Sequence, residues 1–161
     1  MSNCPRGTFV DARGLHGLSC RRSAGRHTRH SQLNDIIWRS LCRAKIPASK
    51  EQLGLTRSDG KRPDGVTLFP WSHGKCLTLD VTVPDTMATS HVQATSTAAG
   101  AAADRAAASK KTKYAARQLT HIFVPVSVET MGSWNCESLN FVNSIGRKLT
   151  AVTGDPLETI D

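Results

Sequence analysis

Two carboxylates stand on either side of a predicted β-hairpin. Asp64 follows a basic pair and a proline, and Asp80 lies inside a run of apolar and β-branched residues. Such runs on both sides of a break rich in Ser and Gly favour a hairpin. If the hairpin is centred on His73, Asp64 faces Thr82 and Val66 faces Asp80, so that the two aspartates are diagonal neighbours about 7–8 Å apart at the backbone. Two carboxylates at this spacing can share a divalent cation, and a register slip of one residue would separate them.

Positive charge is concentrated upstream of Pro63. The chain has a formal net charge of +8, and residues 1–62 hold 13 of its 21 lysines and arginines but 4 of its 13 acids. The candidate contacts are Arg21, Arg22, Arg26, Arg29, His30, Lys61 and Arg62. Such a surface favours a polyanion whose affinity falls as salt rises, and a solvated basic arm is the alternative. We expect a nucleic-acid partner.

Length and composition indicate one intracellular domain. The chain has 161 residues and a mass of 17.4 kDa, enough for a modest core. No run approaches about 18 consecutive apolar residues and no secretory signal is visible, so we expect no membrane partner. The cysteines are scattered and odd in number, which favours a reducing compartment over a disulfide framework. We expect a nuclear or cytoplasmic protein that is not secreted.

The first predicted element is an amphipathic helix. Residues 1–30 show no sustained periodicity and read as a loop. The helix is expected to begin at Ser31, a suitable N-cap, and to end before Pro47. Its apolar face is made of residues at helical spacing: Leu33, Ile36, Ile37, Leu41 and Ala44.

The strands and helices that follow give an α/β pattern. Residues 52–55 read as a short strand, and residues 58–61 as a turn into the carboxylate hairpin. The alanine-dense stretch 98–116 predicts a helix with Gly100 as its weak point.

A strand and a helix complete the pattern. Residues 122–128 read as a strand in which Pro125 favours an edge or a bulge. Residues 135–152 read as a helix that stops at Gly154 and Pro156. Its inward face is expected to contain Leu139, Val142, Ile145 and Leu149.

Several motifs occur in an order known from one protein family. They are Val10-Asp11-Ala12-Arg13-Gly14-Leu15-His16-Gly17-Leu18-Ser19-Cys20, Arg29-His30 before Leu33-Asn34-Asp35-Ile36-Ile37, Lys61-Arg62-Pro63-Asp64-Gly65, Asp80-Val81-Thr82, and Lys110-Lys111-Thr112-Lys113-Tyr114. Over almost all of residues 4–155 the chain resembles the C-terminal, restriction-endonuclease-like domain that follows the reverse transcriptase of some non-LTR retrotransposons. Each motif alone is weakly specific, whereas the ordered set is fairly specific. No Tyr/Phe-x-Asp-Asp polymerase motif is present.

The resemblance implies a fold and an activity. The fold would be a restriction-endonuclease-like α/β core over residues 31–155, built as helix, three strands in antiparallel hairpins, helix, strand and helix. An irregular basic segment, residues 1–30, would precede it, and a tail, residues 156–161, would follow. The activity would be metal-dependent nicking of target DNA to prime reverse transcription, here in a detached fragment. DNA is the expected partner, with retroelement RNA as a second.

The resemblance also implies roles for individual residues. Asp64 and Asp80 would hold Mg²⁺, which prefers oxygen ligands. In the wider nuclease superfamily a lysine stands two residues after the second acid, but here that residue is Thr82. The family takes its lysine from the following helix, where the candidates are Lys110, Lys111 and Lys113, with Tyr114 beside them. Glu129 is either a carboxylate that supports the site or a surface residue.

The resemblance includes a zinc knuckle near the N-terminus. Cys4, His16 and Cys20 match its ligands, but Arg6 stands where a second cysteine is expected. Structural zinc uses four ligands, so Zn²⁺ would be held here by three ligands and a water, more weakly, or by His27 or His30 as the fourth ligand if the loop folds back. The missing cysteine leaves two alternatives to a nuclease: a catalytically inactive nucleic-acid-binding remnant, or an inert product of a degenerate element.

Overall fold

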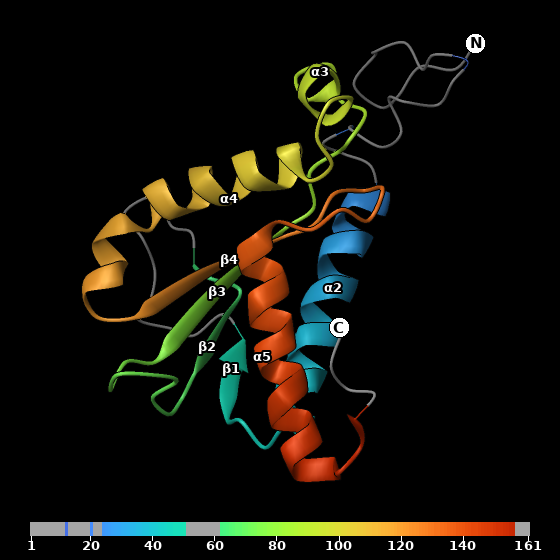
Figure 1. Cartoon of the computed structure of the whole chain (residues 1–161). Helices are drawn as coiled ribbons and strands as arrows, with labels where there is room; N and C mark the ends of the chain where they lie inside the picture. Colours follow the sequence, from blue (N-terminus) through green and yellow to red (C-terminus); the bar gives the residue numbers. More distant parts are fainter. Residues whose placement is uncertain (1–11, 13–19, 21–23, 51–61, 157–161) are drawn as a thin grey trace.

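The protein is a mixed α/β structure in which helices cover both faces of a four-stranded sheet (Figure 1). This computed structural model describes residues 12, 20, 24–50 and 62–156. In the described part, the helices are α2 (Ala24–Arg43), α3 (Val92–Thr95), α4 (Ala101–Lys113), the 3₁₀ helix η1 (Ala115–Leu119) and α5 (Cys136–Thr153). The strands are β1 (Ala48–Lys50), β2 (Gly65–Thr67), β3 (Leu77–Thr82) and β4 (Ile122–Ser127).

The sheet has the order β1-β2-β3-β4. β1, β2 and β3 are antiparallel neighbours, whereas β4 runs parallel to β3 after the crossover that contains α4. The predicted hairpin strands and the predicted strand at residues 122–128 are confirmed as β2, β3 and β4. Pro125 lies in β4, an edge strand, as the sequence predicts. The predicted strand 52–55 and turn 58–61 lie outside the described residues, and the strand that pairs with β2 is β1.

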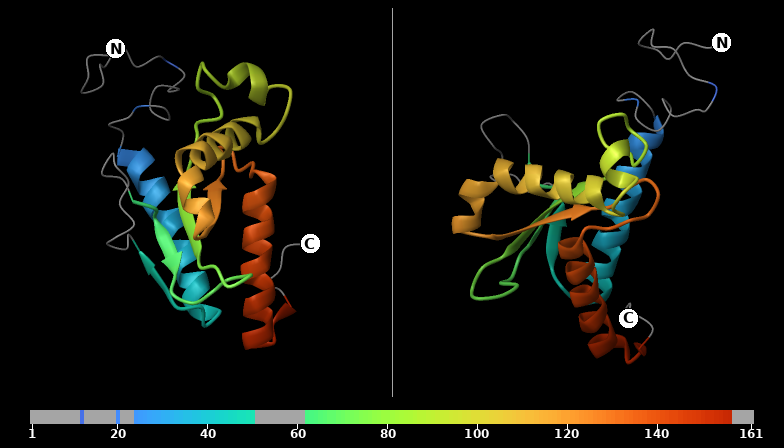
Figure 2. Two further views of the ribbon diagram at one scale, coloured as in Figure 1. Left: turned by 90° about the vertical axis from the view of Figure 1, so that its left-hand side faces the viewer. Right: turned by 45° about the horizontal axis from the view of Figure 1, so that its top comes forward.

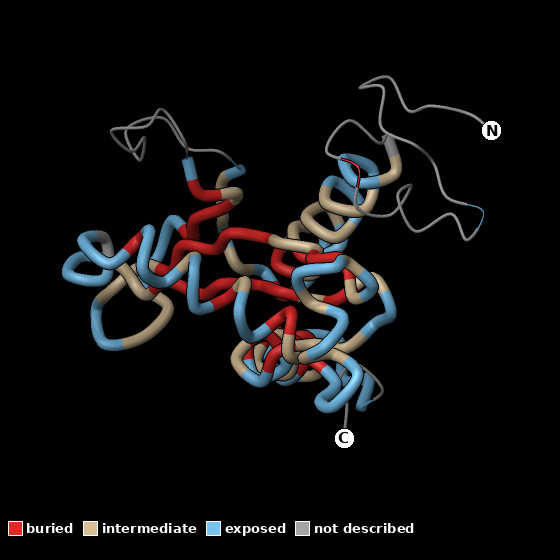
Figure 3. The backbone as a smooth tube through the Cα atoms, turned by 90° about the horizontal axis from the view of Figure 1, so that it is seen from above, coloured by how far each residue is buried: buried red, intermediate tan, exposed pale blue. Residues whose placement is uncertain are grey.

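Alternation along β3 and β4 divides their side chains between two helical layers. Leu77, Leu79 and Val81 belong to one core cluster with residues of α2 and α5. On the opposite face Phe123 of β4 stacks on Tyr114 at the end of α4, with ring centroids 4.6 Å apart. Figure 2 shows α4 on one side of the sheet and α2 and α5 on the other. Most residues of β3 and β4 are buried, and the buried segments lie in the interior of the molecule (Figure 3). None of the described helices is long and apolar enough to cross a membrane.

α2 begins earlier than the sequence predicts. It starts at Ala24, so Ser31 lies inside the helix and is not its N-cap. The prediction that residues 1–30 form a loop is therefore wrong for residues 24–30. Ile37 and Leu41 are buried as expected, but Ile36 is 54% exposed.

The start of α4 and the buried face of α5 differ from the predictions. Gly100 precedes α4 as its N-cap, with φ of 86°, and is not a weak point within the helix. α5 has Asn135 as its N-cap and Gly154 as its left-handed C-cap, close to the predicted limits. Within α5, Leu139 is 37% exposed, and Phe141 occupies the buried position instead.

Candidate metal and phosphate site

The β2–β3 pairing brings Asp64 and Asp80 together. Gly65 pairs with Leu79 and Val66 with Thr78, and continuing this register by one residue places Asp64 directly opposite Asp80. The register centred on His73 is therefore wrong by two residues. Because two residues is one full side-chain repeat, the shift preserves the face on which both aspartates lie. The two carboxyl groups are close enough that each shifts the pKa of the other.

Asp64 is held in its ionised form by two donors. Its Oδ2 accepts a 2.7 Å hydrogen bond from the backbone N–H of Val81 and lies 3.1 Å from Nε2 of His30 on α2. Burial disfavours the charge, but these contacts outweigh it and lower the pKa of Asp64 below its ordinary value. The hydrogen bond to Asp64 raises the pKa of His30 against the opposing effect of burial.

The partner of Asp80 is a lysine on α4. Lys110 Nζ lies 3.0 Å from both carboxylate oxygens of Asp80, whose side chain is 7% exposed. Burial and the charge of Asp64 raise the pKa of Asp80, and they outweigh the opposing effect of Lys110. The two aspartates thus have pKa values pushed in opposite directions, a common property of carboxylate pairs that bind a cation or share a proton.

Glu129 anchors the helix that carries Lys110. Its side chain is buried, and Oε1 accepts hydrogen bonds from the backbone N–H groups of Ala102 at 2.8 Å and Ala103 at 3.3 Å. These groups lie in the first turn of α4, where backbone donors lack partners within the helix and a negative charge is favourable. Glu129 is therefore neither a surface residue nor in contact with the aspartates: its contact is with the start of α4.

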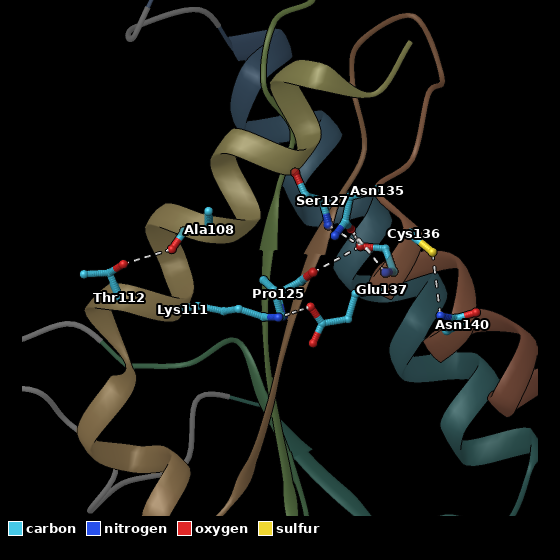
Figure 4. Close-up of polar contacts among 10 residues, drawn as sticks. Ala108, Lys111, Thr112, Pro125, Ser127, Asn135, Cys136, Glu137 and Asn140 are labelled. Carbon is cyan, nitrogen blue, oxygen red and sulfur yellow. Dashed lines mark hydrogen bonds and ion pairs between the residues drawn. The ribbon is translucent and has the colours of Figure 1, made fainter. Parts of the chain in front are cut away.

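Two of the three candidate lysines of α4, Lys110 and Lys111, have different partners. Lys111 forms a 2.6 Å ion pair with Glu137 of α5 (Figure 4). In the same region the Ser138 hydroxyl joins α5 to β4, because it donates to the carbonyl of Pro125 and accepts from the N–H of Ser127. Lys110 alone among the three has a described contact with Asp80.

Tyr114 follows the lysine run and is buried. It is 3% exposed and stacks on Phe123, so its ring belongs to the packing between α4 and β4. Its position fixes the end of α4, just as Glu129 fixes the beginning.

A cleft of about 810 Å³ opens between α2, α4 and the chain after β3. It reaches the aspartates through His30, Val81 and Lys110, which line it and contact them. Its lining includes Arg26, His27 and His30 from α2, and Lys110 and Lys113 from α4. The predicted basic residues Arg26 and His30 thus meet the α4 lysines in one place. We call this feature the α2–α4 cleft.

Some of the other predicted site residues lie in the part of the chain that the structure describes, and others do not. Arg29 lies in α2 and Arg62 just before Asp64, and both have contacts of their own. Cys4, His16, Arg21, Arg22 and Lys61 lie outside the described residues, and so does the predicted zinc set except Cys20, which is buried. Within the described part of the chain, no three His, Cys, Asp or Glu side chains are grouped to hold a metal ion.

The contact between His30 and Asp64 was not foreseen, although the sequence carried a signal for it. His30, Leu33, Ile37, Leu41 and Ala44 recur at intervals of three or four residues, which is one face of a helix. Because the sequence predicts that the helix begins at Ser31, it places His30 in a basic arm and not on this face. The role of Glu129 had no comparable local signal, since it depends on a contact between segments far apart in the chain.

Comparison with known proteins gives no match: neither a family model nor a curated protein matches this chain. The function is therefore inferred from the residues and geometry of the site.

Proposed function

We propose that the chain is a metal-dependent DNA endonuclease domain of the restriction-endonuclease-like class, as in non-LTR retrotransposon proteins, and that it nicks target DNA to prime reverse transcription. One observation carries the proposal. Asp64, just before β2, lies opposite Asp80 of β3, and Asp80 contacts Lys110, which also lines the α2–α4 cleft. These are the residue types that hydrolysis of a phosphodiester requires: oxygen ligands for a hard cation, and a cationic donor for the phosphate.

The carboxylate pair fits Mg²⁺. This ion is commonly bound by one or two carboxylates, with waters and substrate phosphate completing its six ligands, so a pair is sufficient. Two nearly buried carboxylates in contact repel each other when both are ionised, and a shared cation removes that repulsion. When bound, Mg²⁺ would lower the pKa of a coordinated water and neutralise charge on the phosphate. Asp64 and Asp80 are the residues that would hold it.

Lys110 is suited to stabilise the reacting phosphate. An ammonium group has three N–H donors, and the two oxygens of Asp80 engage it at equal distance. A further donor remains for a phosphoryl oxygen or for the attacking water. Because the Lys110 side chain is only 26% exposed, its charge is screened less than that of a surface lysine.

His30 and the cleft supply orientation. His30 and the N–H of Val81 both bind Oδ2 of Asp64, which fixes the carboxylate and leaves Oδ1 for other ligands. Arg26, His27 and Lys113 line the cleft and provide positive charge for flanking phosphates. The hydrolysis forms a bond from a water oxygen to phosphorus and breaks the bond from phosphorus to the leaving sugar oxygen.

The architecture supports the same class. The order of helix, three antiparallel strands, helix, parallel strand and helix agrees with the restriction-endonuclease-like core that the sequence motifs imply. Fold alone does not determine activity, so the proposal depends on the three site residues.

A cleavage assay with matched aspartate variants tests the proposal. The substrate is an end-labelled DNA duplex with Mg²⁺ or Mn²⁺, and the variants are Asp64→Asn and Asp35→Asn. Asp35 is a suitable control because it is a surface aspartate paired with Arg39 and Lys50, outside the site. Asp64→Asn should abolish cleavage and leave metal-free DNA binding equal or slightly tighter, whereas Asp35→Asn should cleave as the wild type does. Cleavage by Asp64→Asn at the wild-type rate would contradict the proposal.

One observation favours a second candidate, a catalytically inactive nucleic-acid-binding remnant. Both aspartates already have cationic partners within the chain, Lys110 for Asp80 and His30 for Asp64. These partners could neutralise the pair without any metal. Wild-type protein that binds DNA but does not cleave it with either metal would support this candidate.

A further inference from the structure

The tip of the β2–β3 hairpin exposes an apolar surface at the end of β3 opposite to Asp80. Leu68 is 51% exposed and Phe69 is 65% exposed. The 3₁₀ helix η1 lies beside the hairpin, where Lys75 Nζ donates to the backbone carbonyl of Gln118 at 3.3 Å. The next residue of η1, Leu119, is 80% exposed. Exposed apolar side chains thus occur on the hairpin tip and on η1, two segments that the Lys75–Gln118 contact joins, and none of them lines the α2–α4 cleft.

Phe69 is held in its exposed position by the backbone around it. The buried Thr67 hydroxyl donates to the carbonyl of Phe69 at 2.9 Å and accepts from the N–H of Leu77 at 2.9 Å. The N–H of Leu68 donates to the carbonyl of Pro47 at 2.8 Å. These bonds fix the chain on both sides of Phe69, so a partner that stacks on its ring does not have to order the hairpin first.

The surroundings of the tip are basic. Trp71 packs on Phe141 of α5, with ring centroids 5.7 Å apart, and Lys148 lies 4.9 Å from the centre of the Trp71 ring. Lys75 adds a second ammonium group beside η1. Segments 65–79, 105–128 and 138–154, which supply the hairpin tip, η1 and the part of α5 after Glu137, contain no aspartate or glutamate.

We propose that this surface, Leu68, Phe69, Lys75, Leu119 and Lys148, binds single-stranded nucleic acid, with Phe69 stacking on an unpaired base. An exposed aromatic ring next to lysines, without acids, is the combination with which proteins bind single strands. A second protein is a poorer fit, because lysine is depleted in protein interfaces. The proposal does not depend on nuclease activity, since none of these residues belongs to the site formed by Asp64, Asp80 and Lys110.

The test is fluorescence anisotropy with a labelled 20-nucleotide oligothymidine, in EDTA, on the full chain. Phe69→Ala should raise the Kd about 5- to 140-fold, the loss expected for one stacked base. Phe69→Trp should bind at least as tightly as the wild type. Phe69→Leu, which keeps apolar area but removes the ring face, should weaken binding as Phe69→Ala does. Met131→Ala is the matched control, because Met131 is 69% exposed at the opposite end of the sheet.

Salt dependence separates stacking from charge. Phe69→Ala should leave the slope of log Kd against log salt unchanged, whereas Lys148→Gln should reduce it by about 0.7. Wild-type affinity in Phe69→Ala, or in Phe69→Leu, would overturn the proposal. So would a change of oligomeric state in Phe69→Ala by sedimentation, because the tip would then be a contact between copies of the chain. If Asp64→Asn loses cleavage but binds oligothymidine with wild-type affinity, the single-strand-binding proposal stands.

Discussion

Lys110 contacts both carboxylate oxygens of Asp80 at 3.0 Å, and this pair joins α4 to the centre of the sheet. Lys111, one residue further along, points to Glu137 on α5 instead. The sequence does not separate these two adjacent lysines, but in the structure Lys110 is the one of the pair that contacts Asp80.

The two lysines should respond differently to truncation. Lys110→Ala removes the cationic donor next to Asp80 and should slow DNA cleavage by about 100-fold or more, a loss typical of one charge-stabilising donor. Lys111→Ala should cleave at close to the wild-type rate and lose at most about 1 kcal/mol of stability, because its ion pair is partly exposed. Single-turnover kinetics measures the cleavage rate of each variant, and urea denaturation measures its free energy of unfolding. Equal rate losses in the two variants would contradict the assignment.

His30 should make stability depend on pH. Its pKa is raised by Asp64, so its contribution is fully present below the unfolded pKa of about 6.5 and is lost as the pH rises through the higher folded value. The Tm of the wild type in EDTA should therefore fall over this window, and His30→Gln should flatten that fall. NMR titration should give His30 a pKa above its ordinary value, and Asp64→Asn should lower it. An unchanged His30 pKa in Asp64→Asn would show that the pair does not form.

Glu129 should contribute to both stability and cleavage. Glu129→Ala leaves the N–H groups of Ala102 and Ala103 without their acceptor in a buried place, and should cost about 1–3 kcal/mol. Because Glu129 anchors α4, cleavage should fall as well under conditions in which the variant remains folded. Glu137→Ala is the control, since its partly exposed pair with Lys111 should cost no more than about 1 kcal/mol. Urea denaturation with equal losses in both variants would argue against the capping role.

Gly100 should not tolerate a side chain. Its φ is +86°, and a Cβ would lie 3.1 Å from the backbone carbonyl oxygen of Trp134. Gly100→Ala should therefore lose about 1–3 kcal/mol. Gly132→Ala separates the effect of the positive φ from that of the close contact, because Gly132 has a φ of +94° but nothing within 4 Å of a Cβ. Gly132→Ala should lose less free energy of unfolding than Gly100→Ala. Equal losses in the two variants would mean that the contact with Trp134 has no effect.

Local patterns predict much of the fold. The hairpin strands, β4 and α5 all have signals within a few residues, such as β-branched runs and the Asn135 and Gly154 caps. The start of α2 was missed because residues 24–30 carry few apolar side chains. The buried face of α5 is predicted only in part, because Leu139 and Phe141 lie about 200° apart around the helix and packing decides which of these two sides is buried.

The site was predictable only to the level of residue types. The two aspartates and the lysine run were identified from motifs. The partner of each lysine depends on how α4 rotates against the sheet, and that rotation is set by contacts distant in sequence, including Glu129 at its start and Tyr114 at its end. Spacing along the chain does not encode such contacts.

The most direct measurement is the conversion of supercoiled plasmid to open circles by the wild-type chain and by Asp80→Asn, in Mg²⁺, in Mn²⁺ and in EDTA. Asp80 faces Asp64 across the hairpin and contacts Lys110, so it is common to every part of the proposed site. The wild type should nick the plasmid with either metal and not in EDTA, and Asp80→Asn should not nick it in any condition. Nicking by Asp80→Asn at the wild-type rate, or no nicking by the folded wild type with either metal, would contradict the nuclease proposal.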